Sequence, residues 1–140
     1  MPVKEHSFYE RVGKIIELLA ASKYHAKANF FNYLPSQILV PLVKNQTGLY
    51  LDQDGGVKAL ITWAYITDEV EVALCESGRS IRSNEWSSGH RLFINDFVCP
   101  YGNTCEIIND ARERFFQKFS NATSVRRYED GTVRKVNLWK

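Results

Sequence analysis

No apolar run in this chain approaches the length of a membrane-spanning helix. Crossing a bilayer takes about 20 consecutive apolar residues, and the 140-residue sequence contains no stretch close to that. Its first six residues, Met1 to His6, carry no apolar core of the kind found in secretory signal peptides. We therefore predict a cytoplasmic protein with no transmembrane segment.

Cysteine is scarce, and its spacing excludes two classes of small protein. The three residues Cys75, Cys99 and Cys105 are odd in number and contain no Cys-x-x-Cys pair. A disulfide framework needs paired cysteines, and a zinc knuckle needs closely spaced ligands. The pattern predicts reduced, mostly buried thiols and no metal site.

The chain also has little net charge, and nothing in it indicates nucleic-acid binding. The formal net charge is only +2 at pH 7. The distribution of charge is more informative. From Arg112 onward the chain has eight basic and three acidic residues, a net charge of +5. A basic C-terminal third suits an acidic partner, or it is a solvated face with no partner.

The length predicts one domain, which at this size buries roughly 68–70% of its unfolded surface. Ser7 and Glu10 form a Ser-x-x-Glu capping box, and apolar residues then recur at helical spacing to about Ala21. A second helical stretch follows. We expect it to break near Pro35 and Pro41, because proline cannot donate to the helix ladder.

The middle of the chain predicts a hairpin, followed by a segment whose secondary structure is ambiguous. Strands are predicted at Leu49–Gln53 and Val57–Ile66, joined by the turn Asp54-Gly55-Gly56. Residues 68–76 alternate acidic and apolar side chains, a pattern that fits either a strand or a short helix. Residues 77–88 are polar and loop-like.

The last third predicts a strand, a helix and a second hairpin. The strand is Leu92–Cys99, and Asn103 or Thr104 can cap the following helix. The hairpin strands are Ser124–Tyr128 and Thr132–Trp139. Together these elements indicate the α+β class. The core face of the helical segment is Ile107, Ile108, Ala111, Phe115, Phe116 and Phe119.

One carboxylate in this last third lies where a strand should be apolar. Asp96 sits among Phe93, Ile94, Phe97 and Val98. Burying an unpaired carboxylate costs several kcal/mol or forces its protonation. Asp96 therefore either faces solvent or caps a loop, or it takes part in chemistry.

Several motifs together resemble a known enzyme family. They carry the spacings Trp-x-Ser-Gly, Phe-Ile-x-Asp and Pro-aromatic-Gly, a specific combination. The chain resembles the RTX toxin-activating lysine-acyltransferases, small bacterial proteins that fatty-acylate pore-forming protoxins. The matching segments are Ser22-x-x-His25, Ile61-Thr62-Trp63-Ala64, Trp86-Ser87-Ser88-Gly89-His90-Arg91, the stretch from Phe93 to Gly102 that contains Asp96 and Pro100-Tyr101-Gly102, and Val133-Arg134-Lys135-Val136.

The resemblance implies a fold, an activity and three site residues. The fold would be similar to the GCN5-related N-acetyltransferases, a mixed sheet flanked by helices, with residues 1–140 forming a single acyltransferase domain. The activity would be transfer of a fatty acyl group from acyl carrier protein to an internal lysine of an RTX protoxin. The family's functional histidine, aspartate and contributory serine fall on His25, Asp96 and Ser22. Family members have been described as dimers, so a homodimer is a further expectation.

The chain departs from the family pattern at a few positions near the aspartate. His90 stands where the family commonly has an aspartate, and Phe93 and Phe97 stand where it has tryptophans. These changes leave the chemistry in place. They put the substrate range and the choice of acyl chain in question.

The chemistry of lysine acylation explains the residue types. A lysine amine has a pKa near 10.4, so at pH 7 only about one molecule in a few thousand is nucleophilic. Removing its proton is worth roughly 4–5 kcal/mol, which a positioned base can help to supply. In one scheme His25 is that base and Asp96 orients it. In the other, Asp96 holds the incoming ammonium and accepts its proton.

The resemblance also implies a co-substrate in place of a bound cofactor. This would be the acyl-phosphopantetheine of acyl carrier protein, lying at the strand–helix junction. A single glycine there, Gly102, in place of a glycine-rich pyrophosphate loop favours a carrier protein over free coenzyme A. Basic residues could steer the acidic carrier. The candidate carrier contacts are Arg112, Arg114, Arg126 and Arg127, and the candidate phosphopantetheine contacts are Phe97, Val98, Cys99, Gly102, Asn103 and Thr104.

The sequence allows three other hypotheses about its function. In the first, Cys99 is a covalent nucleophile, with His25 or His90 as its base and Asp96 as the orienting group. In the second, the chain is a non-catalytic, toxin-binding chaperone on the same scaffold. In the third, it is a coenzyme A-dependent N-acetyltransferase.

Overall fold

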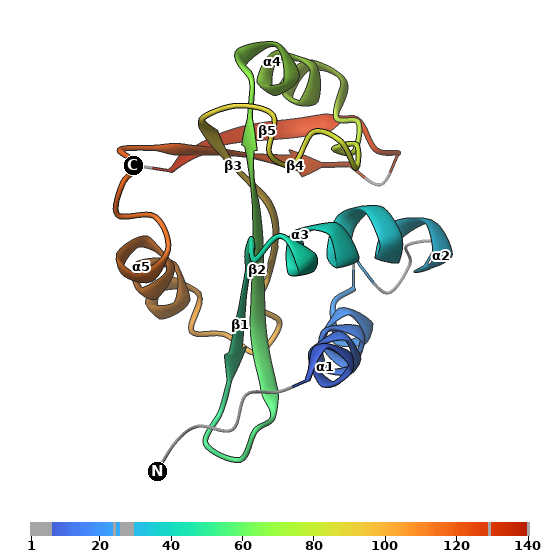
Figure 1. The fold of residues 1–140 in the computed structure, drawn as a ribbon, viewed down its shortest axis with the longest axis vertical. Helices are drawn as coiled ribbons and strands as arrows, with labels where there is room; N and C mark the ends of the chain where they lie inside the picture. Colours follow the sequence, from blue (N-terminus) through green and yellow to red (C-terminus); the bar gives the residue numbers. More distant parts are fainter. Residues whose placement is uncertain (1–6, 24, 26–29, 129, 140) are drawn as a thin grey trace.

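A five-stranded mixed sheet forms the centre of the molecule (Figure 1). The computed structural model describes residues 7–23, 25, 30–128 and 130–139. The strand order follows the chain, and every neighbouring pair is antiparallel except the parallel pair β3–β4. The strands are β1 (Thr47–Leu51), β2 (Val57–Ile66), β3 (Arg91–Val98), β4 (Ala122–Arg127) and β5 (Val133–Trp139).

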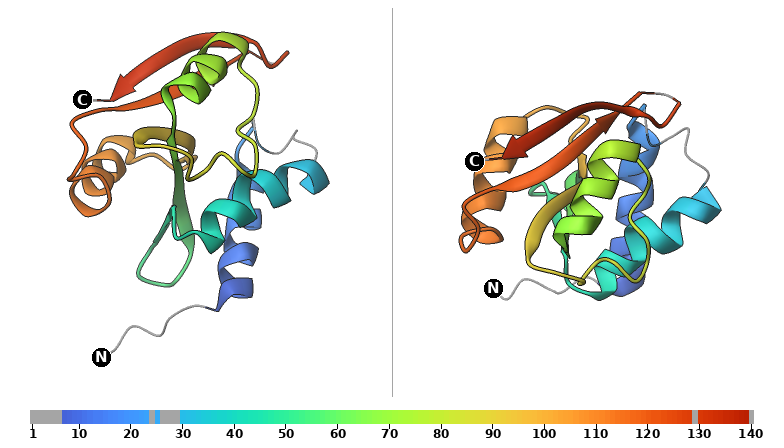
Figure 2. Two further views of the ribbon diagram at one scale, coloured as in Figure 1. Left: turned by 45° about the horizontal axis from the view of Figure 1, so that its top comes forward. Right: turned by 90° about the horizontal axis from the view of Figure 1, so that it is seen from above.

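Helices cover both faces of this sheet, and Figure 2 shows the same arrangement from two other directions. On one face lie α1 (Phe8–Ala21), α2 (Phe30–Tyr33) and α3 (Val40–Val43), with core side chains from α1 and α3 packed against β2 and β3. On the other face lies α5 (Thr104–Arg114), whereas α4 (Asp68–Ser77) packs on the first face, against β3 and β5. The predicted α+β fold, similar to the GCN5-related N-acetyltransferases, is confirmed.

Helix α1 begins where the capping signal predicts. The hydroxyl of Ser7 accepts a hydrogen bond from the backbone N–H of Glu10 at 3.1 Å. The apolar stripe of α1 packs against the sheet, with Ile15, Leu18 and Leu19 buried. The helix ends at its C-cap, Ser22, whose backbone N–H bonds to the carbonyl of Leu19.

The predicted break at the two prolines is wrong. The chain stays helical from α2 to α3, and its hydrogen-bond spacing widens to a π-helix, η2 (Leu34–Leu39), between them. Pro35 and Pro41 each lie in the first positions of a new helical segment. A proline lacks the N–H that an interior helix position uses, and the change of hydrogen-bond spacing beside each proline accommodates this lack.

The structure contains the first predicted hairpin and shows that the ambiguous segment is a helix. Strands β1 and β2 pair across the predicted turn, although β1 begins and ends two residues earlier than predicted. The ambiguous segment is the helix α4. The Thr67 hydroxyl caps it by accepting from Val70 N–H at 3.2 Å, and Gly78 ends it at φ +70°. The acidic side chains in its first turn interact favourably with the positive end of the helix dipole, which stabilises the helix.

Asn103 is the N-cap residue of α5, as predicted, but it does not cap the helix with its side chain. Asn103 occupies the N-cap position in the left-handed region, at φ +64°, and its side chain makes no capping hydrogen bond. The helix also ends at Arg114, so Phe115 and Phe116 lie just beyond it, where both pack against Trp63. The C-terminal hairpin is confirmed, with β4 starting two residues earlier than predicted.

A close backbone approach fixes the loop that leads into β3. A Cβ atom on Gly89 would lie 2.3 Å from the carbonyl oxygen of Ile66. We expect Gly89→Ala to lower the free energy of unfolding by about 1–3 kcal/mol, because the backbone must shift. The control is Gly13→Ala in α1, where a Cβ meets nothing within 4 Å, and which should raise stability by up to about 1 kcal/mol. Urea denaturation measures both, and an unchanged Gly89→Ala variant would contradict the expectation.

Candidate active site

A β-bulge in β3 lies at the predicted catalytic aspartate. Thr62 of β2 pairs with Asp96, whereas the next residue, Trp63, pairs with Ile94. Asn95 is therefore one extra residue on β3. The hydroxyl of Thr62, almost fully buried, accepts from the backbone N–H of Asp96 at 3.1 Å. That bond holds the backbone of the bulge in place.

The bulge decides which face of the sheet Asp96 joins. Side chains alternate along a regular strand, and Ile94 packs with the core on the α5 side. After the bulge, Phe97 again packs on the α5 side, and Val98 packs on the α1 side. Asn95 and Asp96 both bond to residues of the helical segment that precedes β1. An extra residue of this kind re-aims a side chain.

The imidazole of His25 and the carboxylate of Asp96 are in contact. His25 Nε2 lies 2.8 Å from Asp96 Oδ1. Their side chains are only 9% and 11% exposed, respectively. The end of α1 at Ser22 turns the chain so that His25 points at β3, which brings together two residues 71 positions apart.

Ser22 extends this pair into a chain of three hydrogen-bonded groups. Its Oγ lies 2.7 Å from His25 Nδ1 and also accepts from the His25 backbone N–H at 3.4 Å. A carboxylate only accepts hydrogen bonds, so the imidazole carries its proton on Nε2, toward Asp96. The Nδ1 lone pair then accepts from the Ser22 hydroxyl. The structure thus brings together all three residues that the resemblance singled out.

Tyr33 and Asn95, which the sequence did not single out, lie against Asp96, and a third polar residue, Gln37, bonds to Asn95. The phenol of Tyr33 donates to Asp96 Oδ2. The amide of Asn95 donates to Gln37 Oε1 at 2.9 Å and lies 3.5 Å from Asp96 Oδ2. Gln37, buried in η2, donates to the carbonyl of Ile81 at 2.8 Å. In the sequence, only Asn95 gave a hint of these contacts, because it is a second polar residue beside Asp96 in an apolar strand.

The predicted phosphopantetheine segment is partly open and partly in the core. The side chain of Val98 is buried, so only its backbone can meet a ligand. Phe97 is half-buried against the ring of Trp139, with centroids 6.0 Å apart. The rest of the junction, from Gly102 to Thr104, is exposed. Strand β3 pairs with β4 at Phe93 and Thr123.

The cysteines and His90 occupy different surroundings from those of Asp96. The Cys99 thiol is half-buried and donates to the carbonyl of Gly102 at 2.9 Å. Cys105 is exposed, so the prediction of mostly buried thiols is wrong there, because the first turn of α5 faces water. Burial and two neighbouring glutamates raise the pKa of Cys75. His90 is exposed in the loop before β3.

The four arginines predicted to meet an acidic carrier differ in their surroundings. Arg127 is half-buried and donates to the carbonyls of Gly78 at 2.7 Å and Arg79 at 3.2 Å, which ties β4 to the end of α4. Arg114 pairs with Asp110 at 3.2 Å. Arg112 and Arg126 are exposed, as is Arg114 despite its ion pair.

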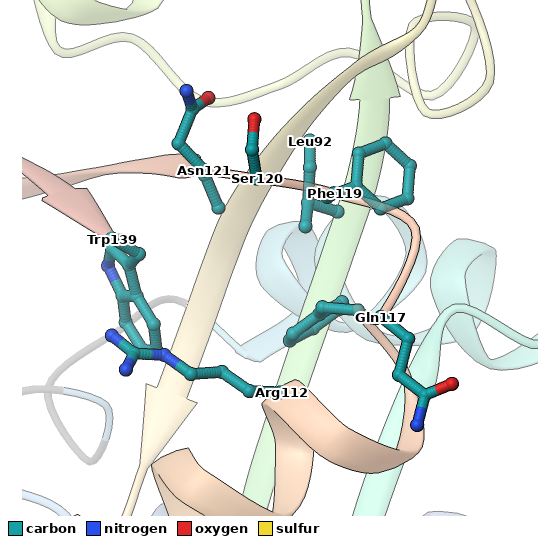
Figure 3. A pocket seen from close by; sticks show the side chains of 9 residues that line it. Leu92, Arg112, Gln117, Phe119, Ser120, Asn121 and Trp139 are labelled. Atoms are coloured by element: carbon teal, nitrogen blue, oxygen red, sulfur yellow. The ribbon is translucent and has the colours of Figure 1, made fainter.

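A cavity of about 170 Å³ lies on the α5 side of β3 (Figure 3). In the figure Arg112 and Trp139 stand on one side of it, and Phe119 and Gln117 on the other. It lies apart from the face to which the bulge turns Asp96. The lining residues are Leu92, Arg112, Phe116, Gln117, Phe119, Ser120, Asn121, Ala122 and Trp139.

The described part of the chain lacks two features, a cluster of metal ligands and a membrane-spanning helix. Within residues 7–23, 25, 30–128 and 130–139, no three His, Cys, Asp or Glu side chains are grouped so that they could hold a metal ion. In the same part of the chain, none of the helices has both the length and the apolar character needed to span a bilayer.

Comparison with known proteins places the chain in a family. The profile of the RTX toxin acyltransferase family (HlyC) matches residues 4–140. The lysine-acyltransferase RtxC of Vibrio cholerae serotype O1 is 28% identical over 107 residues, which cover 76% of this chain and 69% of the relative. The RTX-II toxin-activating lysine-acyltransferase ApxIIC of Actinobacillus pleuropneumoniae is 30% identical over 104 residues, covering 74% and 64%.

A third relative has a more specific name. The protein-lysine myristoyltransferase RtxC of Kingella kingae is 27% identical over 107 residues, covering 76% of this chain and 63% of the relative. The chain thus spans between 63% and 69% of the length of these three proteins. Because the family profile matches nearly the whole chain, the protein belongs to the RTX toxin acyltransferase family.

Proposed function

We propose that this protein is a lysine acyltransferase that activates an RTX-type protoxin. It moves a fatty acyl chain from acyl carrier protein to an internal lysine side chain. The observation that carries the proposal is the hydrogen-bonded chain Ser22–His25–Asp96 in a member of this family. The names of its relatives, lysine-acyltransferases and a myristoyltransferase, support it.

The reaction is attack of a lysine amine on a thioester carbonyl. A C–N bond forms, the C–S bond breaks, and the amine loses one proton while the phosphopantetheine sulfur gains one. His25 Nδ1 faces the Ser22 hydroxyl at 2.7 Å. The amine can therefore give its proton to Ser22 as Ser22 gives its own to Nδ1. The imidazolium then supplies the proton that the thiolate takes up.

The contacts of Asp96 favour the scheme in which His25 is the base. Oδ1 accepts from His25 and Oδ2 accepts from Tyr33. A carboxylate with both oxygens engaged is better placed to orient the imidazole and stabilise its charged form than to receive a substrate ammonium. We therefore assign Asp96 the orienting role.

The donor is proposed to be a carrier-protein thioester. The junction after β3 offers Gly102 without a glycine-rich pyrophosphate loop, which disfavours free coenzyme A. Arg112 and Arg126 are exposed and can attract an acidic carrier. Arg127 and Arg114 bind groups of the protein itself, so they contribute less to this attraction.

Intact-mass analysis of a protoxin tests the proposal. The purified protein is incubated with a panel of RTX protoxins, beginning with RTX-II, and with myristoyl-acyl carrier protein, myristoyl-coenzyme A or acetyl-coenzyme A. We expect a myristoyl increment on protoxin lysines from the carrier-bound donor. Transfer from acetyl-coenzyme A alone would indicate an N-acetyltransferase. Tight protoxin binding with no increment from any donor would indicate the chaperone. Either result overturns the proposal.

The Ser22 hydroxyl should matter for the rate of this transfer. We expect Ser22→Ala to lower kcat by about 10²-fold or more, because the variant loses the hydroxyl that passes the amine proton to Nδ1. Ser22→Thr keeps a hydroxyl and should retain more activity. Steady-state kinetics with the carrier-bound donor measures the effect, and thermal melting controls for a change in the stability of the fold. An acyl adduct trapped on Ser22 would contradict direct transfer and indicate a covalent route.

A further inference from the structure

We infer that Tyr33 is a positioning residue for the His25–Asp96 pair. Its phenol donates to Asp96 Oδ2, the oxygen that His25 does not use. This contact holds the carboxylate plane so that Oδ1 faces the imidazole Nε2–H. The effect on the rate rests on the proposed function, whereas the effect on the imidazole does not.

Tyr33 contacts both members of the pair. It is the last residue of α2, at the point where the helix widens into η2. Its ring stands edge-on to the His25 imidazole, with centroids 5.9 Å apart and planes 68° apart. Its hydroxyl reaches Asp96 on β3, 63 positions away. One side chain therefore packs the imidazole and anchors the carboxylate.

The phenol restrains the side chain of Asp96, whose torsions the backbone leaves free. The bulge and the Thr62 hydroxyl fix the Asp96 main chain, but the side chain can still rotate about Cα–Cβ and Cβ–Cγ. The other donor to Oδ2, Asn95 Nδ2, lies 3.5 Å away, beyond the usual range of a good hydrogen bond. Because Asp96 is largely buried, water poorly replaces the phenol. Without the hydroxyl, the carboxylate rotates and loses its alignment with Nε2.

Two variants separate the hydroxyl from the ring. Tyr33→Phe removes the hydrogen bond to Asp96 and keeps the ring against His25 and the partly buried contacts with the α1-side core. Tyr33→Leu removes both. The matched control is Tyr50→Phe, because Tyr50 donates to Asp110 at 2.7 Å, a second tyrosine–aspartate pair away from Asp96.

The experiment combines kinetics with ¹⁵N NMR of the imidazole rings. The sequence has three histidines, His6, His25 and His90, and a His25→Gln variant identifies the His25 signal. We expect the wild-type ring to be in the Nε2–H tautomer and Tyr33→Phe to show a mixture of tautomers. Its kcat should fall about tenfold or more with an unchanged KM for donor and protoxin, and Tyr33→Leu should lose more. Tyr50→Phe should match the wild type.

The result that overturns the inference is a Tyr33→Phe variant with wild-type ring signals and wild-type kcat. A fall in kcat with unchanged ring signals would also overturn it, because the phenol would then act otherwise than on the imidazole. The NMR measurement needs no substrate. If the protein transfers no acyl group, the ring signals still decide the role of Tyr33, so failure of the proposed function is seen separately.

Discussion

Replacing His25 by alanine should lower acyl transfer to the protoxin by about 10²- to 10⁴-fold, the usual contribution of a general acid–base group. The variant loses the lone pair at Nδ1 that takes the amine proton through Ser22, and it loses the proton donor for the leaving thiolate. It also leaves Asp96 without its partner on Oδ1. Intact-mass analysis of protoxin incubated with myristoyl-acyl carrier protein measures the loss.

The matched control for this variant is His90→Ala. His90 is an exposed imidazole in the loop before β3, and its removal should leave the rate within about twofold of the wild type, since surface changes away from a site have small effects. Both variants should still bind the protoxin, as a pull-down can show. If His25→Ala acylates at the wild-type rate, the base has been assigned to the wrong residue.

Asp96→Asn should reduce kcat by about 10³- to 10⁴-fold, comparable to the loss when a triad aspartate becomes an amide. An amide of the same size can still reach His25 and Tyr33. It carries no charge to stabilise the imidazolium, and its NH₂ group can turn toward Nε2 and impose the wrong tautomer. The loss should therefore appear in kcat, with KM for both substrates little changed. Single-turnover kinetics measures the chemical step directly.

The melting temperature of Asp96→Asn is a second, independent test of the role of Asp96. Burying a carboxylate costs free energy, so Asp96→Asn should melt at the same temperature as the wild type or higher. The control is Asp110→Asn, which alters the other tyrosine–aspartate pair and should leave the rate unchanged. A joint fall in melting temperature and activity for Asp96→Asn would instead identify Asp96 as part of the framework of the fold.

Much of the architecture follows from local signals in the sequence. The helix that starts at Ser7, the hairpin around Gly55 and the C-terminal hairpin all appear where the patterns predict them. These elements depend on contacts between residues close in the chain, such as a cap or a turn, and short-range patterns report such contacts well. Local signals failed at Pro35, where the helix continues with a wider hydrogen-bond spacing.

From the sequence alone, the motifs indicate a family, and the resemblance to that family directs attention to Ser22, His25 and Asp96. The sequence did not determine how those residues meet. The tertiary structure decided that Asn95 is an extra residue in β3, which turns Asp96 toward His25, and that Tyr33 bonds to the same carboxylate. These contacts span 63 and 71 positions. They depend on the register between strands and on where a helix docks, properties that no short stretch of sequence encodes.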